Sequence, residues 1–215
     1  MNWLQDLPEQ ERALFEARFL PRRFRRGETL VFQGDDSFSV GVIDAGHVSV
    51  NVATPHGERV TVTALGPGGT FGEIAQITRQ GRTATLIALD DVKVRILPGA
   101  VFEEMRQRIP AIDRALLLAL AARVDDLSAR LAEAAYETVQ RRCERRLVEL
   151  SELFLSGDRV SAGIPLTQSD LAGVVGATRP TINQVLGALV DEGLVEVSRG
   201  RIDVPNVEAL RRHAR

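Results

Sequence analysis

The chain has 215 residues, a formal net charge of −2 and a 26% share of charged residues. The chain is longer than one small domain, so we expect two domains, each with its own hydrophobic core. The nearly balanced charge argues against a protein that coats a polyanion over its whole surface, although it leaves room for a local basic patch. Cys143 is the single cysteine, which excludes a disulfide framework and metal sites built from several thiolates.

Residues 20–97 consist of short segments in which apolar and polar side chains alternate. The segments HVSVNV, RVTVTAL, ATLIAL and VKVRIL have the two-residue period of strands, and glycines separate them. This pattern predicts an antiparallel β-sandwich or barrel. The flanking segments LPEQERALFEARF and GAVFEEMRQRI are expected to form short helices that pack against it.

After Pro110 the apolar residues follow a helical period. Steps of four and three residues connect Leu120, Val124, Leu127, Leu131 and Ala134. One interpretation is a single helix buried on the sandwich. The strict spacing favours the other interpretation, an apolar seam between two helices, and therefore a homodimer.

A second helix is expected at about residues 137–155, with an apolar stripe that includes Cys143. We therefore expect this cysteine to be a core thiol rather than a nucleophile. The run RRCERR lies on the same helix. Its arginines are equally compatible with phosphate contacts and with a solvated helix face.

Residues 158–215 have the order helix, turn, helix, hairpin. Thr167, followed by Asp170, is a candidate capping box for the first of these helices. The second has Thr178 as its cap and Pro180 in its first turn, where the missing N–H costs nothing. The hairpin is expected to turn near Arg199 and Gly200.

The stretch FGEIAQITRQGRTAT, residues 71–85, combines two glycine bends with a carboxylate and a guanidinium. The free N–H groups of one helical turn after Gly72 suit an anion, and the Arg82 fork and the Thr83 hydroxyl could close on it. Glu73 would repel a phosphate but could accept a hydrogen bond from a neighbouring sugar hydroxyl. The stretch thus fits a ribose that carries a phosphate. Taken alone, it fits equally well two turn glycines with a surface ion pair.

No pattern of a common enzyme class is present in the sequence. It contains no P-loop and no GxGxxG motif, and His47, His56 and His213 lack the spacing of a metal site. The longest apolar run, ALLLALAA at residues 115–122, is too short to span a membrane. We therefore expect a soluble, cytoplasmic protein that is not an enzyme, binds no metal and contacts no membrane.

Four segments together resemble the Crp/Fnr superfamily of bacterial transcription regulators. They are FRRGETLVFQGD at residues 24–35, IDAGHVSV at 43–50, FGEIAQITRQGRTA at 71–84 and the terminal helix-turn-helix. The resemblance covers essentially the whole chain and implies an α+β fold. Its expected parts are an antiparallel β jelly roll that binds a cyclic nucleotide (1–109), a long dimerisation helix (110–137) and a winged helix-turn-helix that binds DNA (138–215).

The resemblance also implies an effector and partners. The effector would be a cyclic purine nucleotide, either cAMP or cGMP, and the partners would be double-stranded DNA, a second copy of the chain and RNA polymerase. A member that binds no nucleotide, or that responds to a cyclic dinucleotide, is the alternative. Backbone groups of Gly72 and Ile74 would lie near the nucleotide, Glu73 would bind the ribose 2′-hydroxyl, and Arg82 with Thr83 would bind the cyclic phosphate.

The base-recognition positions depart from those of cAMP-responsive members. Where these members place a threonine and a serine on the long helix, this chain has Leu127 and Ser128, preceded by Asp126. A carboxylate there could accept hydrogen bonds from guanine N1 and N2. The choice between cAMP and cGMP therefore stays open.

The helix from Thr178 to Asp191 is expected to read DNA bases from the major groove. Its residues Ile182, Val185, Leu186 and Leu189 share one face, which must pack inward. The remaining face, expected to meet DNA, is formed by Thr178, Arg179, Pro180, Asn183 and Gln184. In the hairpin, Arg199 and Arg201 are expected to reach phosphates.

Overall fold

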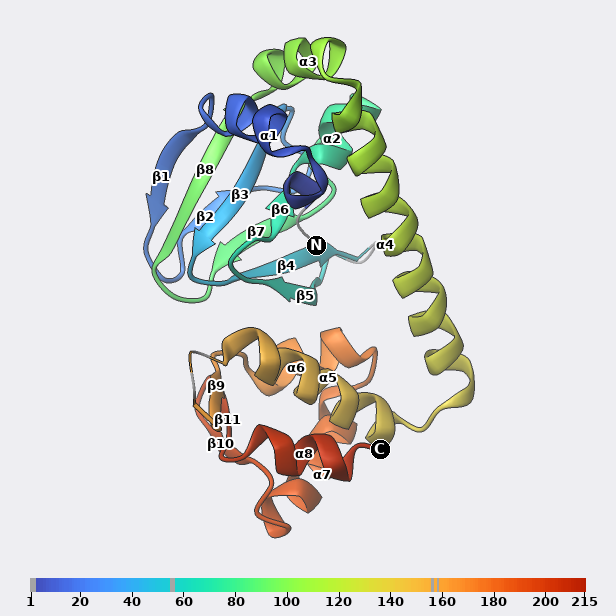
Figure 1. Ribbon diagram of the computed structural model, residues 1–215. Helices are drawn as coiled ribbons and strands as arrows, with labels where there is room; N and C mark the ends of the chain where they lie inside the picture. The colour runs from blue at the N-terminus through green and yellow to red at the C-terminus, as the bar shows by residue number, and fades with distance from the viewer. Residues whose placement is uncertain (1–2, 55–56, 156, 158) are drawn as a thin grey trace. The chain divides into compact units, whose positions relative to one another are not determined.

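The computed structural model describes residues 3–54, 57–155, 157 and 159–215 (Figure 1). The chain divides into two compact units. One comprises Met1–Val52 and Leu65–Ala129, and the other comprises Ala53–Ala64 and Arg130–Arg215.

Two four-stranded sheets account for the predicted alternating segments (Figure 1). The first has the order β1-β8-β3-β6 and comprises Leu20–Phe24, Val92–Pro98, Ser39–Ala45 and Thr70–Phe71. The second has the order β2-β7-β4-β5 and comprises Thr29–Val31, Thr85–Ala88, Val48–Ala53 and Arg59–Leu65. The described pairings are antiparallel, which confirms the predicted β architecture.

Short helices close one end of the sheets around an aromatic cluster. They are η1 (Trp3–Asp6), α1 (Glu9–Glu16) and α3 (Gly99–Arg108). Trp3, Phe15 and Phe102 are buried and meet edge to face, with ring centroids 5.5–6.1 Å apart. Such contacts stabilise a core by about 0.5–1.5 kcal/mol per pair beyond the burial of their surface.

The long helix α4 (Pro110–Tyr136) is buried at its start and exposed further along. Its first turns are buried through Ile112, Ala115 and Leu116. Further along, the apolar side chains are exposed: Leu117 at 68%, Val124 at 60%, Leu127 at 51% and Leu131 at 72%. Leu117, Val124 and Leu131 are spaced by seven residues, so Leu117 belongs to the same apolar stripe. The stripe therefore begins one step earlier than the sequence pattern indicated, which started at Leu120.

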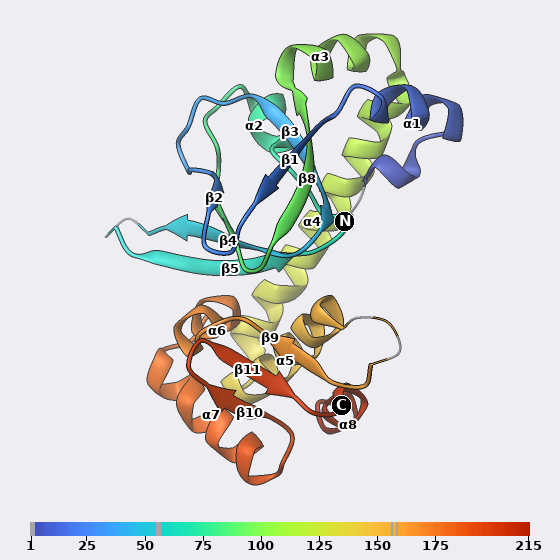
Figure 2. The same ribbon diagram turned by 90° about the vertical axis from the view of Figure 1, so that its left-hand side faces the viewer.

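The C-terminal part consists of helices α5 (Val139–Phe154), α6 (Gln168–Val175), α7 (Arg179–Asp191) and α8 (Val207–His213). A three-stranded sheet of β10 (Glu196–Ser198), β11 (Arg201–Val204) and β9 (Ala162–Ile164) accompanies them (Figure 2). The predicted capping box of Thr167 and Asp170 is present, and Thr178 caps α7. The sequence analysis missed β9 and α8.

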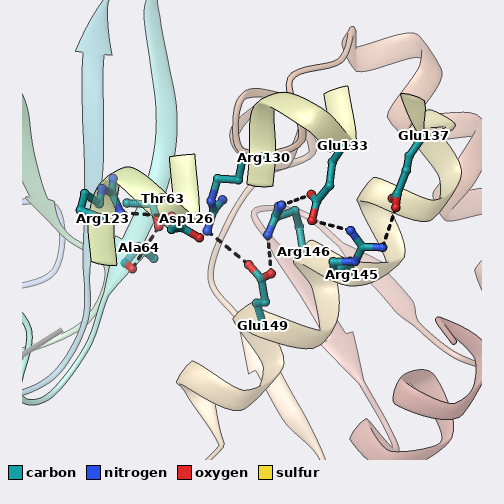
Figure 3. Close-up of polar contacts among 10 residues, drawn as sticks. All are labelled: Thr63, Ala64, Arg123, Asp126, Arg130, Glu133, Glu137, Arg145, Arg146 and Glu149. Atoms are coloured by element: carbon teal, nitrogen blue, oxygen red, sulfur yellow. Dashed lines mark hydrogen bonds and ion pairs between the residues drawn. The ribbon is translucent and has the colours of Figure 1, made fainter. Parts of the chain in front are cut away.

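Two arginines of RRCERR, Arg145 and Arg146, form ion pairs with Glu133 on α4 and Glu137 just after it, which neither interpretation of that run anticipated. Arg141 is exposed. Figure 3 shows Glu133 and Glu137 reaching Arg145 and Arg146 on α5. On the opposite side, Glu149 pairs with Arg146 and, at 3.5 Å, with Arg130. The Arg146 side chain is only 6% exposed, so it cannot belong to a solvated face or reach a phosphate.

Arg142 has the same kind of structural role. Its Nη1 donates to the carbonyl of Ala134 at 3.0 Å and its Nη2 donates to that of Gly176 at 3.2 Å. Cys143, beside it, is fully buried, and burial raises the pKa of its thiol to about 12. The prediction of an unreactive core thiol is confirmed.

Of the three histidines, His47 pairs with Asp90 at 2.7 Å, and His213 lies 3.4 Å from Glu144 and 3.3 Å from Glu192. His47 is thus partly buried and paired, whereas His213 is exposed at the surface and paired. His56 lies outside the described residues.

A candidate ligand site and a candidate nucleic-acid interface

Arg82 is held in place by the loop that connects β2 to β3. Its backbone N–H donates to the carbonyl of Asp35 at 3.0 Å, and its carbonyl accepts from the N–H of Gly34 at 2.8 Å. In the side chain, Nε donates to Ser37 Oγ at 3.0 Å and Nη2 donates to Ser39 Oγ at 2.8 Å. Arg82 is only 4% exposed, and its Nη1 is enclosed without a hydrogen-bond partner among the described residues.

Gly72, which ends β6 and caps α2 (Glu73–Thr78), makes this burial possible. Its φ of 90° is a left-handed conformation that favours glycine. A Cβ at this position would lie 2.0 Å from Arg82 Nη1 and 2.3 Å from the carbonyl oxygen of Ser39. Any side chain here would therefore displace the guanidinium.

Glu73 is the first residue of α2 and supplies the second unpaired polar atom. Its Oε2 is enclosed and has no hydrogen-bond partner in the part of the chain that the structure describes. Burial raises the pKa of Glu73, against the lowering effects of its own backbone N–H, Arg82 and Arg123. Burial likewise lowers the pKa of Arg82, while the charges of Glu73 and Asp35 raise it.

The two unpaired atoms limit what this site can bind. Buried polar atoms are nearly always hydrogen-bonded, and a ligand that offers an acceptor to one of these atoms and a donor to the other would satisfy both. Arg82 Nη1 can donate to an anionic oxygen, and Glu73 Oε2 can accept from a hydroxyl. The exposed ion pair of the alternative interpretation is not observed, because the Arg82 guanidinium is buried and bonded to two serines.

The other predicted ligand residues are more open. Ile74 is 37% exposed, and Thr83 is also exposed. On α4, Leu127 and Ser128 are exposed, and Asp126 lies 3.7 Å from Arg123.

Sequence reasoning missed Arg123, Ser37 and Ser39. The charge of Arg123 on α4 lowers the pKa of Glu73, but less than the other groups that oppose burial. The alternation Ser37-Phe38-Ser39, which leads into β3, was a usable signal, because alternate residues of an extended segment share a face. No sequence pattern, however, identified Arg82 as their partner.

Helix α7 presents the predicted division of its two faces. Ile182, Leu186 and Leu189 are buried. The residues on its exposed face are Arg179, Pro180, Asn183 and Gln184, and Thr178 at its start is also exposed. This arrangement leaves one cationic and two amide side chains free on the first turns of the helix.

The hairpin arginines differ from each other. Arg199 is exposed at the turn between β10 and β11. Arg201, by contrast, pairs with Asp203 at 2.6 Å, and its guanidinium lies against Gly163, where a Cβ would approach Nη2 to 1.7 Å. Arg201 is therefore held against the β10-β11-β9 sheet.

Two features are absent from the described residues. No helix there combines the length and apolar character required to cross a membrane. Within the same residues, no cluster of three or more His, Cys, Asp or Glu side chains could hold a metal ion.

Known proteins match both parts of the chain. The family model of the cyclic nucleotide-binding domain matches residues 21–109, and that of the Crp-like helix-turn-helix domain matches residues 141–213. The chain is 26% identical to the CRP-like cAMP-activated global transcriptional regulator of Mycobacterium tuberculosis, over 91% of this chain and 88% of that protein. It is 27% identical to the cyclic AMP receptor protein of Thermus thermophilus, over 95% and 92%.

A solved structure supports the fold. The c-di-GMP-responsive global regulator CLP of Xanthomonas campestris aligns with a TM-score of 0.75 at 19% identity, over 92% of this chain and 99% of that one. The two family models together match most of the chain, and the relatives match nearly all of it. This chain therefore belongs to the Crp-like family of DNA-binding transcription regulators that carry a cyclic nucleotide-binding domain.

Proposed function

We propose that this protein is a homodimeric regulator whose affinity for specific DNA changes when a cyclic purine nucleotide binds at Glu73 and Arg82. Two observations carry the proposal: Arg82 Nη1 and Glu73 Oε2 are both enclosed without a hydrogen-bond partner among the described residues, and the two residues interact electrostatically. A ribose cyclic phosphate offers both complements on neighbouring groups. Its phosphate oxygen accepts from Arg82, and its 2′-hydroxyl donates to Glu73.

Both cAMP and cGMP fit this chemistry. The two relatives described above are named for their response to cAMP. Asp126, however, lies beside Arg123, whose charge reaches Glu73, and a carboxylate in this region suits the N1 and N2 donors of guanine. The nucleotide is therefore to be identified by titration. Binding of c-di-GMP, to which the aligned Xanthomonas regulator is named as responsive, or of no nucleotide would contradict the proposal.

We propose that a second copy of the chain covers the exposed stripe of α4. Leu117, Val124 and Leu131 repeat every seven residues, and Leu127 lies between them, so two such helices can interdigitate along the stripe. In water an exposed row of large apolar side chains is unfavourable, and burial stabilises it by about 25 cal/mol per Å².

We propose that the exposed face of α7 binds DNA. Arg179 can donate two hydrogen bonds to guanine N7 and O6, and Gln184 can pair with adenine N6 and N7. Pro180 offers no side-chain donor or acceptor and contributes shape alone. Arg199 would contact phosphates, and Arg201 would do so only by leaving Asp203. RNA polymerase is the expected further partner, and the cytoplasm the expected location.

Replacing Arg82 by leucine should weaken cyclic nucleotide binding at least tenfold and leave the fold intact. Removing one partner of a buried charged contact costs about 2–5 kcal/mol, and tenfold corresponds to about 1.4 kcal/mol. Calorimetric titration of the wild type and the variant with cAMP and cGMP measures this loss. Thr83→Val, which removes an exposed hydroxyl, is the matched control and should lose less nucleotide affinity than Arg82→Leu. Equal affinity of the wild type and Arg82→Leu would refute the site.

Replacing Glu73 by glutamine should raise the Tm of the ligand-free protein at pH 7 and weaken nucleotide binding. Because burial raises the Glu73 pKa, its contribution to stability is greatest below the ordinary value of 4.5 and declines as the pH rises through the folded value. Glutamine does not ionise, so its Tm advantage should grow from pH 4.5 to pH 8. A Tm difference that is independent of pH would contradict this explanation.

Replacing Leu127 by aspartate should convert a dimer into a monomer. The change would place two carboxylates per dimer in an apolar seam, at a cost of several kcal/mol. Sedimentation velocity at micromolar concentration distinguishes the two states. Ala132→Asp, exposed on another face of the same helix, should remain dimeric. A wild type that sediments as a monomer would exclude the seam.

Replacing Arg179 by alanine should cost about 1–3 kcal/mol on specific DNA and relax the preference at one base pair per half-site. Arg199→Ala should instead weaken all sequences alike and reduce the salt dependence by about one phosphate contact per monomer. Arg201→Ala should change the salt dependence less, because Asp203 already holds that side chain. Selection from random DNA followed by salt titrations measures all three. Equal losses on specific and random DNA for Arg179→Ala would show that it reads no base.

A further inference from the structure

The loop between β2 and β3, together with the first residue of β3, makes four hydrogen bonds to one residue, Arg82. Gly34 and Asp35 bind the backbone of Arg82, and Ser37 and Ser39 bind its guanidinium. We propose that Ser37 and Ser39 are positioning residues of the ligand site, which orient Arg82 and offer their own hydroxyl protons to the same anion. This proposal rests on the proposed function.

The geometry of the guanidinium determines which edge faces the ligand. Arginine has five N–H donors, and its Nε and Nη2 form one edge of the planar fork. The two serines occupy this edge, at 3.0 Å and 2.8 Å. The edge formed by Nη1 and the second proton of Nη2 stays free, and it carries the two parallel N–H groups that match a phosphate. The serines therefore fix both the plane of the fork and the edge it presents.

The chemical type of the partners is also informative. Other arginines of this chain, such as Arg95, Arg106 and Arg145, pair with carboxylates that offset their charge. Arg82 is more buried than these, yet the hydrogen bonds of its guanidinium go to neutral hydroxyls. A carboxylate in either position would compete with an incoming anion. Serine orients the cation and leaves its charge available to a ligand.

Each hydroxyl retains a proton for the ligand. A serine hydroxyl has one donor and two acceptor positions, and both serines use an acceptor position toward Arg82. Toward the described residues, neither hydroxyl donates a hydrogen bond. An anion on the free edge of Arg82 could thus receive further hydrogen bonds from Ser37 and Ser39, in addition to that from Thr83.

The test uses the full-length protein and whichever of the two nucleotides, cAMP or cGMP, binds to it more tightly. We expect Ser37→Ala and Ser39→Ala each to weaken binding about fivefold and the double variant about twentyfold or more. Ser37→Thr and Ser39→Thr, which keep the hydroxyl, should retain most of the affinity. Ser49→Ala, which removes a hydroxyl bonded to Asn51 rather than to Arg82, is the matched control and should bind like the wild type.

The Rp and Sp phosphorothioate forms of the same nucleotide separate positioning from a general loss of structure. Because the serines orient the fork, the double alanine variant should discriminate less between the two forms, while its Tm without ligand stays near that of the wild type. Unchanged affinity in the double variant, or equal losses for both forms together with a lowered Tm, would overturn the proposal. A wild type that binds neither nucleotide would instead contradict the proposed function, and this inference with it.

Discussion

The structure depends on a buried cation whose charge no hydrogen-bonded carboxylate offsets. Arg82 is almost fully enclosed, and burial disfavours its charged form, as the lowered pKa indicates. Around it lie a loop with four hydrogen bonds, a glycine that leaves room for the guanidinium, and Glu73 at a distance that does not produce an ion pair in the described structure. Burying a charge without compensation is costly, so this arrangement is understandable when a ligand supplies the missing anion.

In the second unit, unlike at Arg82, arginines are paired with carboxylates. Here Arg145 and Arg146 on α5 pair with carboxylates at the end of α4, and Arg142 bonds to backbone carbonyls of Ala134 and Gly176. Exposed ion pairs contribute little to stability, but Arg146 is buried, and the loss of its partners would leave an uncompensated charge. These contacts fix α5 against the last turns of α4. They link the helix proposed to dimerise with the first helix of the DNA-binding part.

The sequence was sufficient where function follows from local pattern. Strand alternation and the caps of α6 and α7 depend on neighbours within a few residues. It was insufficient where distant segments meet. Ser37 and Ser39 are more than forty residues from Arg82, and only the folded sandwich brings them together. Likewise, the partners of RRCERR became evident only once α4 and α5 were seen to pack, because a run of arginines has the same pattern whether it is solvated or paired.

The proposed regulation requires that occupancy of the Arg82 site change the affinity for DNA. Thermodynamic linkage requires that DNA binding change the affinity for the nucleotide by the same factor, which is typically about 5–150-fold. The most direct measurement is the affinity of the wild-type protein for a DNA site selected from random sequence, by fluorescence anisotropy, without nucleotide and with saturating cAMP or cGMP. The account predicts a change of at least fivefold with one of them. A protein that binds the nucleotide but holds the same DNA with unchanged affinity would contradict it.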